Sequence, residues 1–486
     1  MGFRRCAMWL AMTCVSVATA DSLDAQSIQI GPEEPVAAGL EGRPLVEPHL
    51  AIHPTNPDHM LVAVMITAAT ETFEERIKQQ QCAVLLSTDG GTSWLRHEFA
   101  ITACYDPWVA ITRDGHAVFT ALGGHATLPQ SGDDELLVFH SADGGRTWDE
   151  RPVGLGRGHD HETVVVDGST PGREGWLYVV SSRDVRADDG RVRTAVFVAR
   201  SRNGGRTFDP PTHVRTSNLY TRTETPVVLS DGTLVVSFVD VATDGGLTGL
   251  LRRRAWVMRS TDGGHTFSLP LFVNEACGPP PRFSLSALIA STSDGPYRDR
   301  LYFACNLPGA RDVVVSHSAD RGESWSEPIP TRAITDSASA RKLMAAATSP
   351  EGILAIAWRD GRHRPGTECF DVYVNASLDG GATFLREQRV TSTTSCSDRK
   401  LNGTGWSDGG DYFGLASDAN GRFRLLWSDA REGVFRLRTA TVEITKGPPG
   451  HKVTLVGSGP SRCCFDRPRE VQVTSRQCSK DSVDLT

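Results

Sequence analysis

The sequence predicts an all-β propeller in which one unit of about 58 residues is repeated around an axis. Two observations support this fold class. The 47 glycines exceed average usage and indicate many tight turns. Six octapeptides of the pattern S-x-D-x-G-x-T-aromatic begin at Ser87, Ser141, Ser201, Ser260, Ser318 and Ser377, with start-to-start spacings of 54, 60, 59, 58 and 59 residues.

Each octapeptide has the composition of a hairpin tip. It follows a short run of β-forming residues, at 83–86, 137–140, 196–200, 256–259, 313–317 and 372–376. The aspartate, replaced by Asn203 in the third copy, can accept hydrogen bonds from the following turn, and the glycine supplies a positive φ. The final aromatic residue restarts a strand and can pack between sheets. We therefore expect each octapeptide to join two antiparallel strands.

The number of blades follows from a second recurring unit, an aliphatic strand, a turn and another strand. Seven such pairs begin near residues 47, 106, 161, 224, 284, 342 and 411, against six octapeptides. The last pair continues into a strand at 434–444 without an octapeptide, and residues 27–35 can supply its outer strand. Closing the ring with the two termini would remove an exposed sheet edge. We prefer seven blades, with six as the alternative.

The two ends of the chain differ from the repeat region. Arg4 and Arg5, the apolar stretch 6–18 and the A-x-A pattern at 18–20 are typical of a secretory signal. Twin-arginine export, or lipidation at Cys14, fits the surrounding residues less well. No later segment is long and apolar enough to cross a membrane. We expect a secreted or periplasmic protein with a signal at 1–20, a propeller at 21–445 and a partly ordered C-terminal extension at 446–486.

Cysteine usage agrees with export. Of the 11 cysteines, two lie in the predicted signal, which leaves nine. Neighbours in sequence suggest the disulfides Cys82–Cys104, Cys277–Cys305 and Cys369–Cys396, although connectivity cannot be deduced from sequence alone.

The first strand of each blade lines the central channel of a propeller, so the starts of these strands converge on one face. Convergent polar groups in such a concavity favour a binding site. Aligning the seven aliphatic cores brings a mixed ring of charged and aromatic residues to this funnel: Glu47, His49, Asp106, Trp108, Asp160, His161, Glu162, Arg222, Glu224, Arg282, Arg341, Lys342, Asp411 and Tyr412.

The octapeptides resemble the Asp-box, or bacterial neuraminidase repeat, of the sialidase superfamily, and the resemblance covers residues 47–444. It implies Asp boxes on the outer parts of the blades and a glycan or glycoconjugate as partner. Sialidases use an aspartate as acid/base and a tyrosine nucleophile assisted by a glutamate. The chain order therefore implies these roles for Asp106, Tyr412 and Glu224 respectively.

The same resemblance implies a carboxylate clamp, because the family holds its substrate carboxylate with three arginines. Arg282 and Arg341 match two of them in chain order, and we expect Arg222, Lys342 and Trp108 as further substrate contacts. The sequence departs from the family at the first arginine, whose F/Y-R-I-P motif is absent from the equivalent stretch 42–52. Sialidase domains also have six blades. Both departures weaken the case for catalysis.

Three functions follow from these residues. The first is an exported glycoside hydrolase of exo-alpha-sialidase type. The alternative is a non-catalytic glycan- or protein-binding propeller. The third is a hydrolase or lyase on another polysaccharide, which would use Asp106, Glu162 and Glu224.

Other motifs give no support for cofactor chemistry. The G-x-S-x-G match at 405–409 lacks the strand–turn–helix context of a nucleophile elbow. Residues 159–162 offer metal-ligand types, but consecutive side chains on a strand point to opposite faces. The net charge of −7 and the lack of a long basic run argue against nucleic acid. We expect no metal, no cofactor, no nucleic acid and a monomer.

Overall fold

The computed structural model divides the chain into two compact units, residues 28–444 and residues 1–27 with 445–486. The described residues are 27–36, 39–40, 42–68, 72, 75, 78–128, 134–169, 172–173, 175–243, 251–277, 287–291, 295–307, 312–332, 341–402, 409–446, 455–456 and 482–483. The predicted signal lies outside them. In the smaller unit, β31 (Leu455–Val456) pairs with β32 (Ser482–Val483) in antiparallel fashion.

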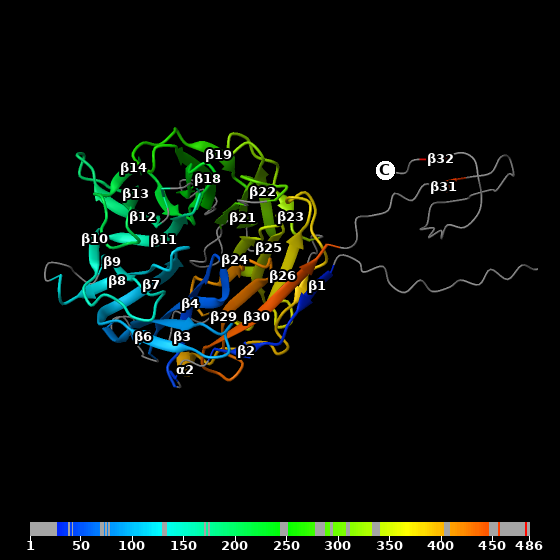
Figure 1. Cartoon of the computed structure of the whole chain (residues 1–486), viewed down its shortest axis with the longest axis horizontal. Helices are drawn as coiled ribbons and strands as arrows, with labels where there is room; N and C mark the ends of the chain where they lie inside the picture. Colours follow the sequence, from blue (N-terminus) through cyan, green and yellow to red (C-terminus); the bar gives the residue numbers. More distant parts are fainter. Residues whose placement is uncertain are drawn as a thin grey trace, which may run out of the picture. The chain divides into compact units, whose positions relative to one another are not determined.

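The larger unit consists of seven antiparallel sheets that follow one another around a common centre (Figure 1). Blade 1 contains β3 (Leu45–His53), β4 (Asn56–Ile66), β5 (Gln81–Ser87) and β6 (Leu95–Glu98). Blade 2 contains β7 (Ile101–Ile111), β8 (Ala117–His125), β9 (Glu135–Ser141) and β10 (Val153–Arg157). Blade 3 contains β11 (His159–Asp167), β12 (Trp176–Arg186), β13 (Val192–Ser201) and β14 (Thr212–Ser217).

The next three blades keep this order. Blade 4 contains β15 (Tyr220–Thr223), β16 (Val227–Val228), β17 (Leu234–Thr243), β18 (Leu251–Ser260) and β19 (Leu271–Asn274). Blade 5 contains β20 (Ala287–Ser291), β21 (Leu301–Asn306), β22 (Val313–Ser318) and β23 (Ile329–Pro330). Blade 6 contains β24 (Arg341–Thr348), β25 (Leu354–Asp360), β26 (Asp371–Ser377) and β27 (Gln388–Arg389), followed by the short helix α2 (Arg399–Asn402).

Blade 7 is closed by the N-terminal segment. Its C-terminal strands are β28 (Gly414–Ser417), β29 (Phe423–Asp429) and β30 (Arg436–Thr445). The outer strand is β1 (Ser27–Ile30), and β2 (Glu34–Pro35) also pairs with β30. The all-β propeller with seven blades and the outer strand expected from residues 27–35 are therefore confirmed, and the six-bladed alternative is wrong.

The octapeptides form the hairpin tips that their composition predicts. In blade 1 the tip joins β5 to β6, where the Ser87 hydroxyl donates to Asp89 Oδ1 at 2.9 Å and accepts from Gly91 N at 2.8 Å. Asp89 also accepts from Ser93 N at 2.9 Å, and the hydrogen bonds from Ser93 and Ser87 lower the pKa of Asp89 to about 2. Asn203 accepts the equivalent amide bond in the third copy, from Thr207 N at 3.0 Å.

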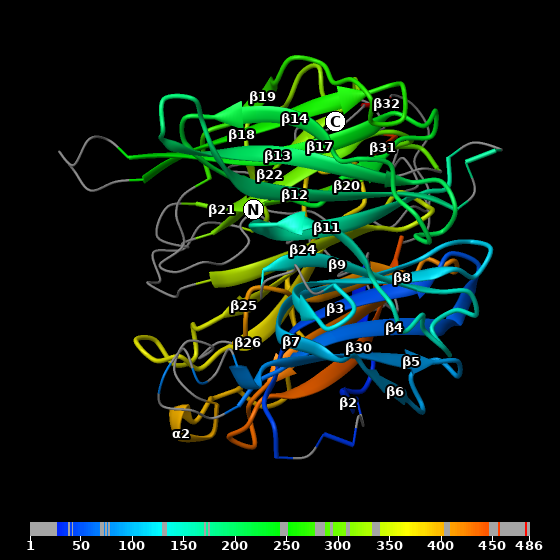
Figure 2. The ribbon, with the colours of Figure 1, turned by 90° about the vertical axis from the view of Figure 1, so that its left-hand side faces the viewer.

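Apolar side chains fill the space between neighbouring blades, and a side view shows the sheets packed face to face (Figure 2). Trp148, the aromatic residue of the second octapeptide, belongs to a buried cluster with Leu61 of blade 1 and Phe119 of blade 2. It contacts the ring of Phe99 edge-on at 5.4 Å between centroids. The aromatic residue of the hairpin therefore joins two blades, as its position in the repeat predicts.

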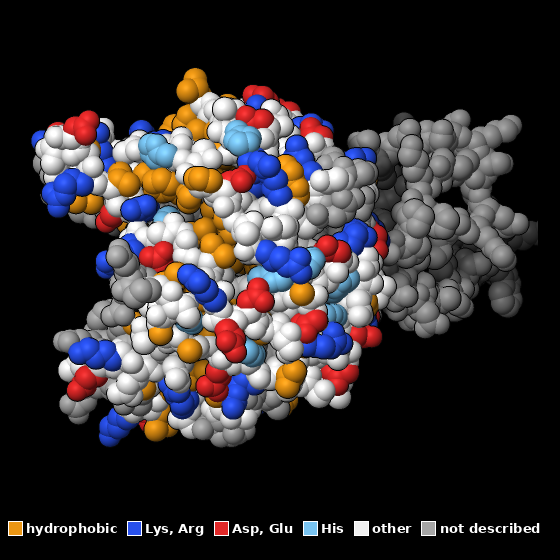
Figure 3. Space-filling view, turned by 60° about the vertical axis from the view of Figure 1, so that its left-hand side comes forward, with side chains coloured by type: hydrophobic (Ala, Val, Ile, Leu, Met, Phe, Trp, Pro, Cys, Tyr) orange, Lys and Arg blue, Asp and Glu red, His pale blue; other side chains and the backbone are white. Residues whose placement is uncertain are grey.

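All three suggested disulfides are present: Cys82–Cys104, Cys277–Cys305 and Cys369–Cys396. The first joins β5 of blade 1 to β7 of blade 2, and the second connects the end of blade 4 to β21 of blade 5. Disulfides of this kind fit an extracellular or other oxidising compartment. None of the helices formed by the described residues has the length and apolar character needed to cross a bilayer. On the face in Figure 3, acidic and basic side chains are interspersed.

Candidate functional site

The inner strands of the first three blades share one backbone irregularity. Glu47, Asp106 and His161 have φ values of 55°, 53° and 60°, each at a break in the register with the next strand. Such left-handed conformations cost non-glycine residues roughly 1–3 kcal/mol each. Glu47 and Asp106 also precede prolines, which restricts their backbones further. Three equivalent strained positions on neighbouring blades point to a functional site.

These bulges bring side chains from five blades together. Asp106 Oδ2 accepts from His161 N at 3.4 Å, which connects blades 2 and 3. Arg222 of blade 4 contacts His161 Nε2, and its Nη2 lies 3.3 Å from Asp411 Oδ2. The amide of Asp411, which precedes blade 7, donates to Glu47 Oε1 of blade 1 at 3.3 Å. We call the following residues the central cluster: Glu47, Asp106, Asp160, His161, Glu162, Arg222, Glu224, Asp411 and Tyr412.

The carboxyl groups of the central cluster hold protons more tightly than ordinary ones. Burial, together with Asp160 and Asp411, raises the pKa of Asp106 to about 7. Burial likewise raises the pKa of Glu224 to about 8. The pKa values of Glu47 and Glu162 are also raised, by burial first and then by neighbouring carboxyls. Asp106 differs from the three glutamates because it is half-buried as a residue, whereas the glutamates are fully buried.

Several buried polar atoms of the central cluster have no hydrogen-bond partner among the described residues. They include both carboxylate oxygens of Glu162, Oε2 of Glu47 and the hydroxyl of Tyr412. Glu162 is 0% exposed and Tyr412 is 1% exposed. The Tyr412 ring packs edge-on against Trp108, at 5.6 Å between centroids. Buried polar groups are normally paired, so an unpaired group next to strained backbone needs a functional explanation.

Arg222 carries the positive charge of the central cluster. Burial lowers its pKa, but the carboxylates of Asp411 and Glu224 outweigh this effect and raise it overall. Glu224 interacts with Arg222 and Arg253, which both act to lower its pKa. The carboxyls that act on Tyr412 are instead Asp106, Glu162 and Glu47; with burial, they raise the pKa of the phenol well above its ordinary value.

Five of the eight predicted site residues lie in or against the central cluster: Asp106, Trp108, Arg222, Glu224 and Tyr412. Arg282 lies outside the described residues. Arg341 and Lys342 begin β24, opposite Asp360 and Arg359, but their side chains are outside the described part of the chain. The carboxylate clamp therefore stays a prediction.

Two residues near the central cluster, Arg253 and Tyr220, are not among those predicted from the sequence. Arg253 comes from β18, a third strand, which an alignment of first strands does not include. Tyr220 is 48% exposed, and its hydroxyl donates to Asp160 Oδ2 at 3.3 Å. Glu47, in contrast, was expected at the funnel, and Glu47-Pro48-His49 repeats the acid–proline–ring order of residues 106–108. His49 and Trp108 are indeed stacked at 3.6 Å between ring centroids.

Among the described residues, no group of three or more His, Cys, Asp or Glu side chains is arranged to hold a metal ion.

Comparison with known proteins agrees with the propeller fold. A family model described as "BNR repeat-like domain" matches residues 15–276. Solved structures that match the chain include a Hadza microbial sialidase, Hz136, at 13% identity and a TM-score of 0.45, covering 86% of this chain and 96% of the other. The phage phi92 endosialidase is 11% identical with a TM-score of 0.48, and the match covers 92% of this chain and 76% of the endosialidase. An ulvan lyase from a new family of polysaccharide lyases is 11% identical with a TM-score of 0.49, and the match covers 84% of this chain and 95% of the lyase. No curated protein matches the chain.

Proposed function

The chain belongs to the BNR repeat-like domain family, and from this premise we propose that its central cluster binds a glycan and hydrolyses a glycosidic bond. The observation that carries the proposal is the state of Asp106. Its backbone is strained at a φ of 53°, the residue is only half-buried, and the pKa of its carboxyl is raised to about 7. A general acid works best when its pKa lies near the working pH.

In the proposed reaction, Asp106 donates its proton to the glycosidic oxygen of the leaving group. Tyr412 attacks the anomeric carbon as its own proton moves to Glu162, and a covalent glycosyl–enzyme intermediate forms. Water then hydrolyses this intermediate: the Asp106 carboxylate takes a proton from the water, and the Tyr412 oxygen regains its proton from Glu162 as the bond to the sugar breaks. Loss of the Tyr412 proton requires an acceptor, because burial and the surrounding carboxyls disfavour a free phenolate. We assign this role to Glu162 instead of Glu224, the helper that the resemblance implies, because Glu162 acts on Tyr412 whereas Glu224 acts on Arg222. Once ionised, Glu162 is a stronger acceptor than an ordinary glutamate because its own pKa is raised.

We assign exo-sialidase chemistry to this site on the resemblance of the repeats, with Arg282, Arg341, Lys342 and Trp108 as substrate contacts. Arg222, which the sequence predicts as a further substrate contact, is instead assigned to hold Asp411 and His161 in place, and Glu224 helps to position Arg222. We place the reaction in a secreted or periplasmic setting, consistent with the three disulfides.

The test is an assay of the full chain on a fluorogenic sialoside and on a set of acidic and neutral oligosaccharides. Asp106→Asn and Tyr412→Phe should each lower kcat/KM by about 100-fold or more. Asp149→Asn is the matched control, because Asp149 lies at the exposed edge of blade 2. No turnover of any substrate, or full activity in both variants, would rule the mechanism out.

A non-catalytic glycan-binding propeller is the second candidate, favoured by a different observation. The side chains of Tyr412 and Glu162 are 1% and 0% exposed, so the proposed nucleophile and its proton acceptor are covered. Binding measured by calorimetry without turnover, and unchanged in Tyr412→Phe, would select this function over hydrolysis.

A further inference from the structure

A second polar cavity of about 580 Å³ lies between the outer strands of blades 6 and 7. Its lining includes Gly31, Glu33, Arg389, Ser392, Arg431 and Arg438. These residues come from the ring-closing N-terminal segment, from β27 and the chain that follows it, and from blade 7. Because β27 and β1 are outer strands and the central cluster sits on inner ones, the cavity is a separate site.

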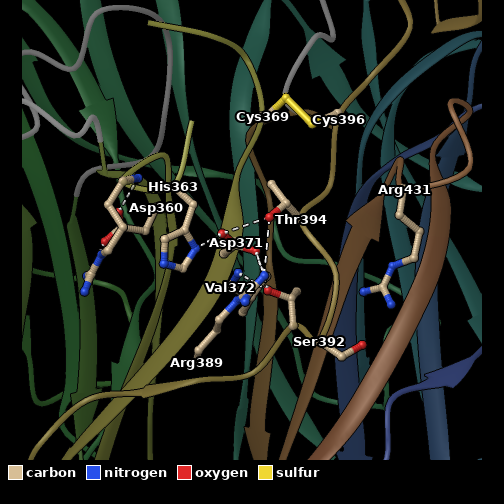
Figure 4. Close-up of polar contacts among 12 residues, drawn as sticks. Asp360, His363, Cys369, Asp371, Val372, Arg389, Ser392, Thr394, Cys396 and Arg431 are labelled. Carbon is tan, nitrogen blue, oxygen red and sulfur yellow. Dashed lines mark hydrogen bonds and ion pairs between the residues drawn. A yellow bond between two sulfur atoms is a disulfide. The ribbon is translucent and has the colours of Figure 1, made fainter. Parts of the chain in front are cut away.

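Two of its three arginines are held in place by fully buried aspartates. Arg389 Nη2 donates to Asp371 Oδ1 at 2.6 Å, and the His363 ring and the Thr391 hydroxyl bind the same carboxylate at 2.7 and 3.0 Å (Figure 4). The Asp371 side chain is 0% exposed. This bracing fixes the Arg389 guanidinium before any ligand arrives, which lowers the ordering cost of binding.

Arg431 is braced in the same way, from the neighbouring blade. It donates to both oxygens of Asp429, at 3.0 and 2.8 Å, and the Asp429 side chain is 0% exposed. Figure 4 shows Arg389 and Arg431 on different blades, with Ser392 on the segment between them.

The only carboxylate among the lining residues is already engaged. Glu33 accepts from Ser392 N through Oε1 and from Arg431 through Oε2. Arg431 is thus committed to two carboxylates. Arg389 and Arg438 can still donate hydrogen bonds to a ligand, because the described hydrogen bonds of their side chains use Nη2 alone. The partner of Arg438 is Glu432, whose side chain is 66% exposed and therefore faces water.

We propose that this cavity binds the carboxylate of an acidic sugar through Arg389 and Arg438. Guanidinium groups grip a planar oxyanion through paired N–H donors, and Arg suits this task better than Lys. The volume is in the range of small-ligand sites and exceeds what a lone inorganic anion fills. Sulfate shares the oxyanion chemistry. The choice of a sugar carboxylate as the ligand rests on the proposed glycan-directed function. The assignment of the cavity as an oxyanion-binding site does not rest on it.

Ligand binding here should stabilise the closed ring. Glu33 belongs to the N-terminal segment, Arg389 to blade 6 and Arg438 to blade 7, so the cavity exists only when the ring is closed. A ligand that binds the folded state alone raises the midpoint of thermal unfolding as its concentration rises.

The experiment titrates the full chain with N-acetylneuraminic acid, glucuronic acid, glucose and sodium sulfate at constant ionic strength, using calorimetry and thermal unfolding. The two acidic sugars should bind and raise the Tm, and glucose should not. Arg438→Gln should weaken binding by about tenfold or more, since it removes one charged fork. Arg389→Lys keeps a cation for Asp371 and should weaken binding to a similar extent.

Two controls separate this site from the rest of the molecule. Arg422→Gln removes an arginine of blade 7 that pairs with Asp418 outside the cavity, and should leave binding unchanged. Asp106→Asn should abolish turnover without affecting the Tm shift, so failure of one proposal is distinguishable from failure of the other. Equal binding by wild type and Arg438→Gln, or no binding by either acidic sugar, would overturn the site. Binding of sulfate alone would overturn the sugar assignment.

Discussion

Glu33 and Arg431 form an ion pair across 398 positions of the sequence, and this contact ties the N-terminal segment to blade 7. Both side chains are nearly buried, at 10% and 12% exposure. Asp429 holds Arg431 from the other side. The pair therefore joins the first and last parts of the propeller.

Blade 6 contains the same arrangement within one continuous stretch of chain. The sequence order W-x-D-x-R occurs at 358–362 and again at 427–431. Arg362 binds both Asp360 and Glu387, as Arg431 binds Asp429 and Glu33. In blade 6 the glutamate directly precedes the outer strand β27, and in blade 7 it lies between β1 and β2. Ring closure thus reuses a contact that stabilises an ordinary blade.

Glu33→Gln should lower the free energy of unfolding by about 1–3 kcal/mol, because it leaves a nearly buried guanidinium with one carboxylate fewer. Urea unfolding monitored by tryptophan fluorescence measures the change. Glu432→Gln is the control. It removes the exposed partner of Arg438 and should lower the free energy of unfolding by less than about 0.5 kcal/mol. Equal effects of the two variants would show that Glu33 does not close the ring.

The rate of the proposed reaction should fall as the pH rises through about 7. Asp106 must carry its proton to act as an acid, and its pKa is raised to about 7 by burial and by Asp160 and Asp411. A pH profile of kcat/KM on the active substrate tests this. Asp160→Asn removes one of the charges that raise the pKa, so it should move the descending limb to lower pH. If the descending limb of the kcat/KM profile lies at the same pH in this variant as in wild type, Asp106 is not the titrating acid.

The contribution of Glu224 to the stability of the folded state should fall as the pH rises from about 4 to about 8. Glu224 has a pKa of about 8 when folded and about 4.3 in an unfolded chain, so the folded state binds its proton more tightly. That contribution is fully present below pH 4 and is lost as the pH approaches 8. Glu224→Gln should unfold at higher temperature than wild type at pH 8 and similarly at pH 5. Parallel pH curves for the two proteins would contradict the burial of this carboxyl.

Gly410→Ala should displace Glu47. A Cβ at this position would lie 2.2 Å from Glu47 Cγ, on a backbone with a φ of +90°. Gly115→Ala separates the clash from the backbone effect, because Gly115 has a φ of +86° and open space around it. Gly115→Ala should lower the free energy of unfolding by about 1 kcal/mol. Gly410→Ala should lower it clearly more and should also lose the proposed activity. Denaturant unfolding and the glycan assay provide the two measurements.

The propeller could be predicted from the sequence because its repeating contacts are local. The hydrogen bonds among Ser87, Asp89, Gly91 and Ser93 span at most four positions, so their residue types reveal the hairpin wherever it recurs. The disulfides Cys82–Cys104, Cys277–Cys305 and Cys369–Cys396 are also short-range, with separations of 22, 28 and 27 residues. The seven strand pairs then favoured seven blades over six, and the seven sheets of the structure decided the number.

The central cluster could be predicted only in part. Aligning strand starts indicated that Asp106, Arg222 and Asp411 converge, since equivalent positions of a propeller face the same axis. The alignment could not supply the left-handed bulges at Asp106 and His161, because nothing in the residue types demands a positive φ there. Nor could it include Arg253, which reaches Glu224 from a different strand.

By itself, then, the sequence determined the repeating unit and the all-β class and favoured seven blades over six, because those features depend on interactions between residues close along the chain. Only the tertiary structure decided which carboxyls share a buried space and that Arg431 meets Glu33. The physical reason is that burial and long-range pairing depend on how separate blades close into a ring, and a raised pKa such as that of Asp106 exists only after water has been excluded from that space.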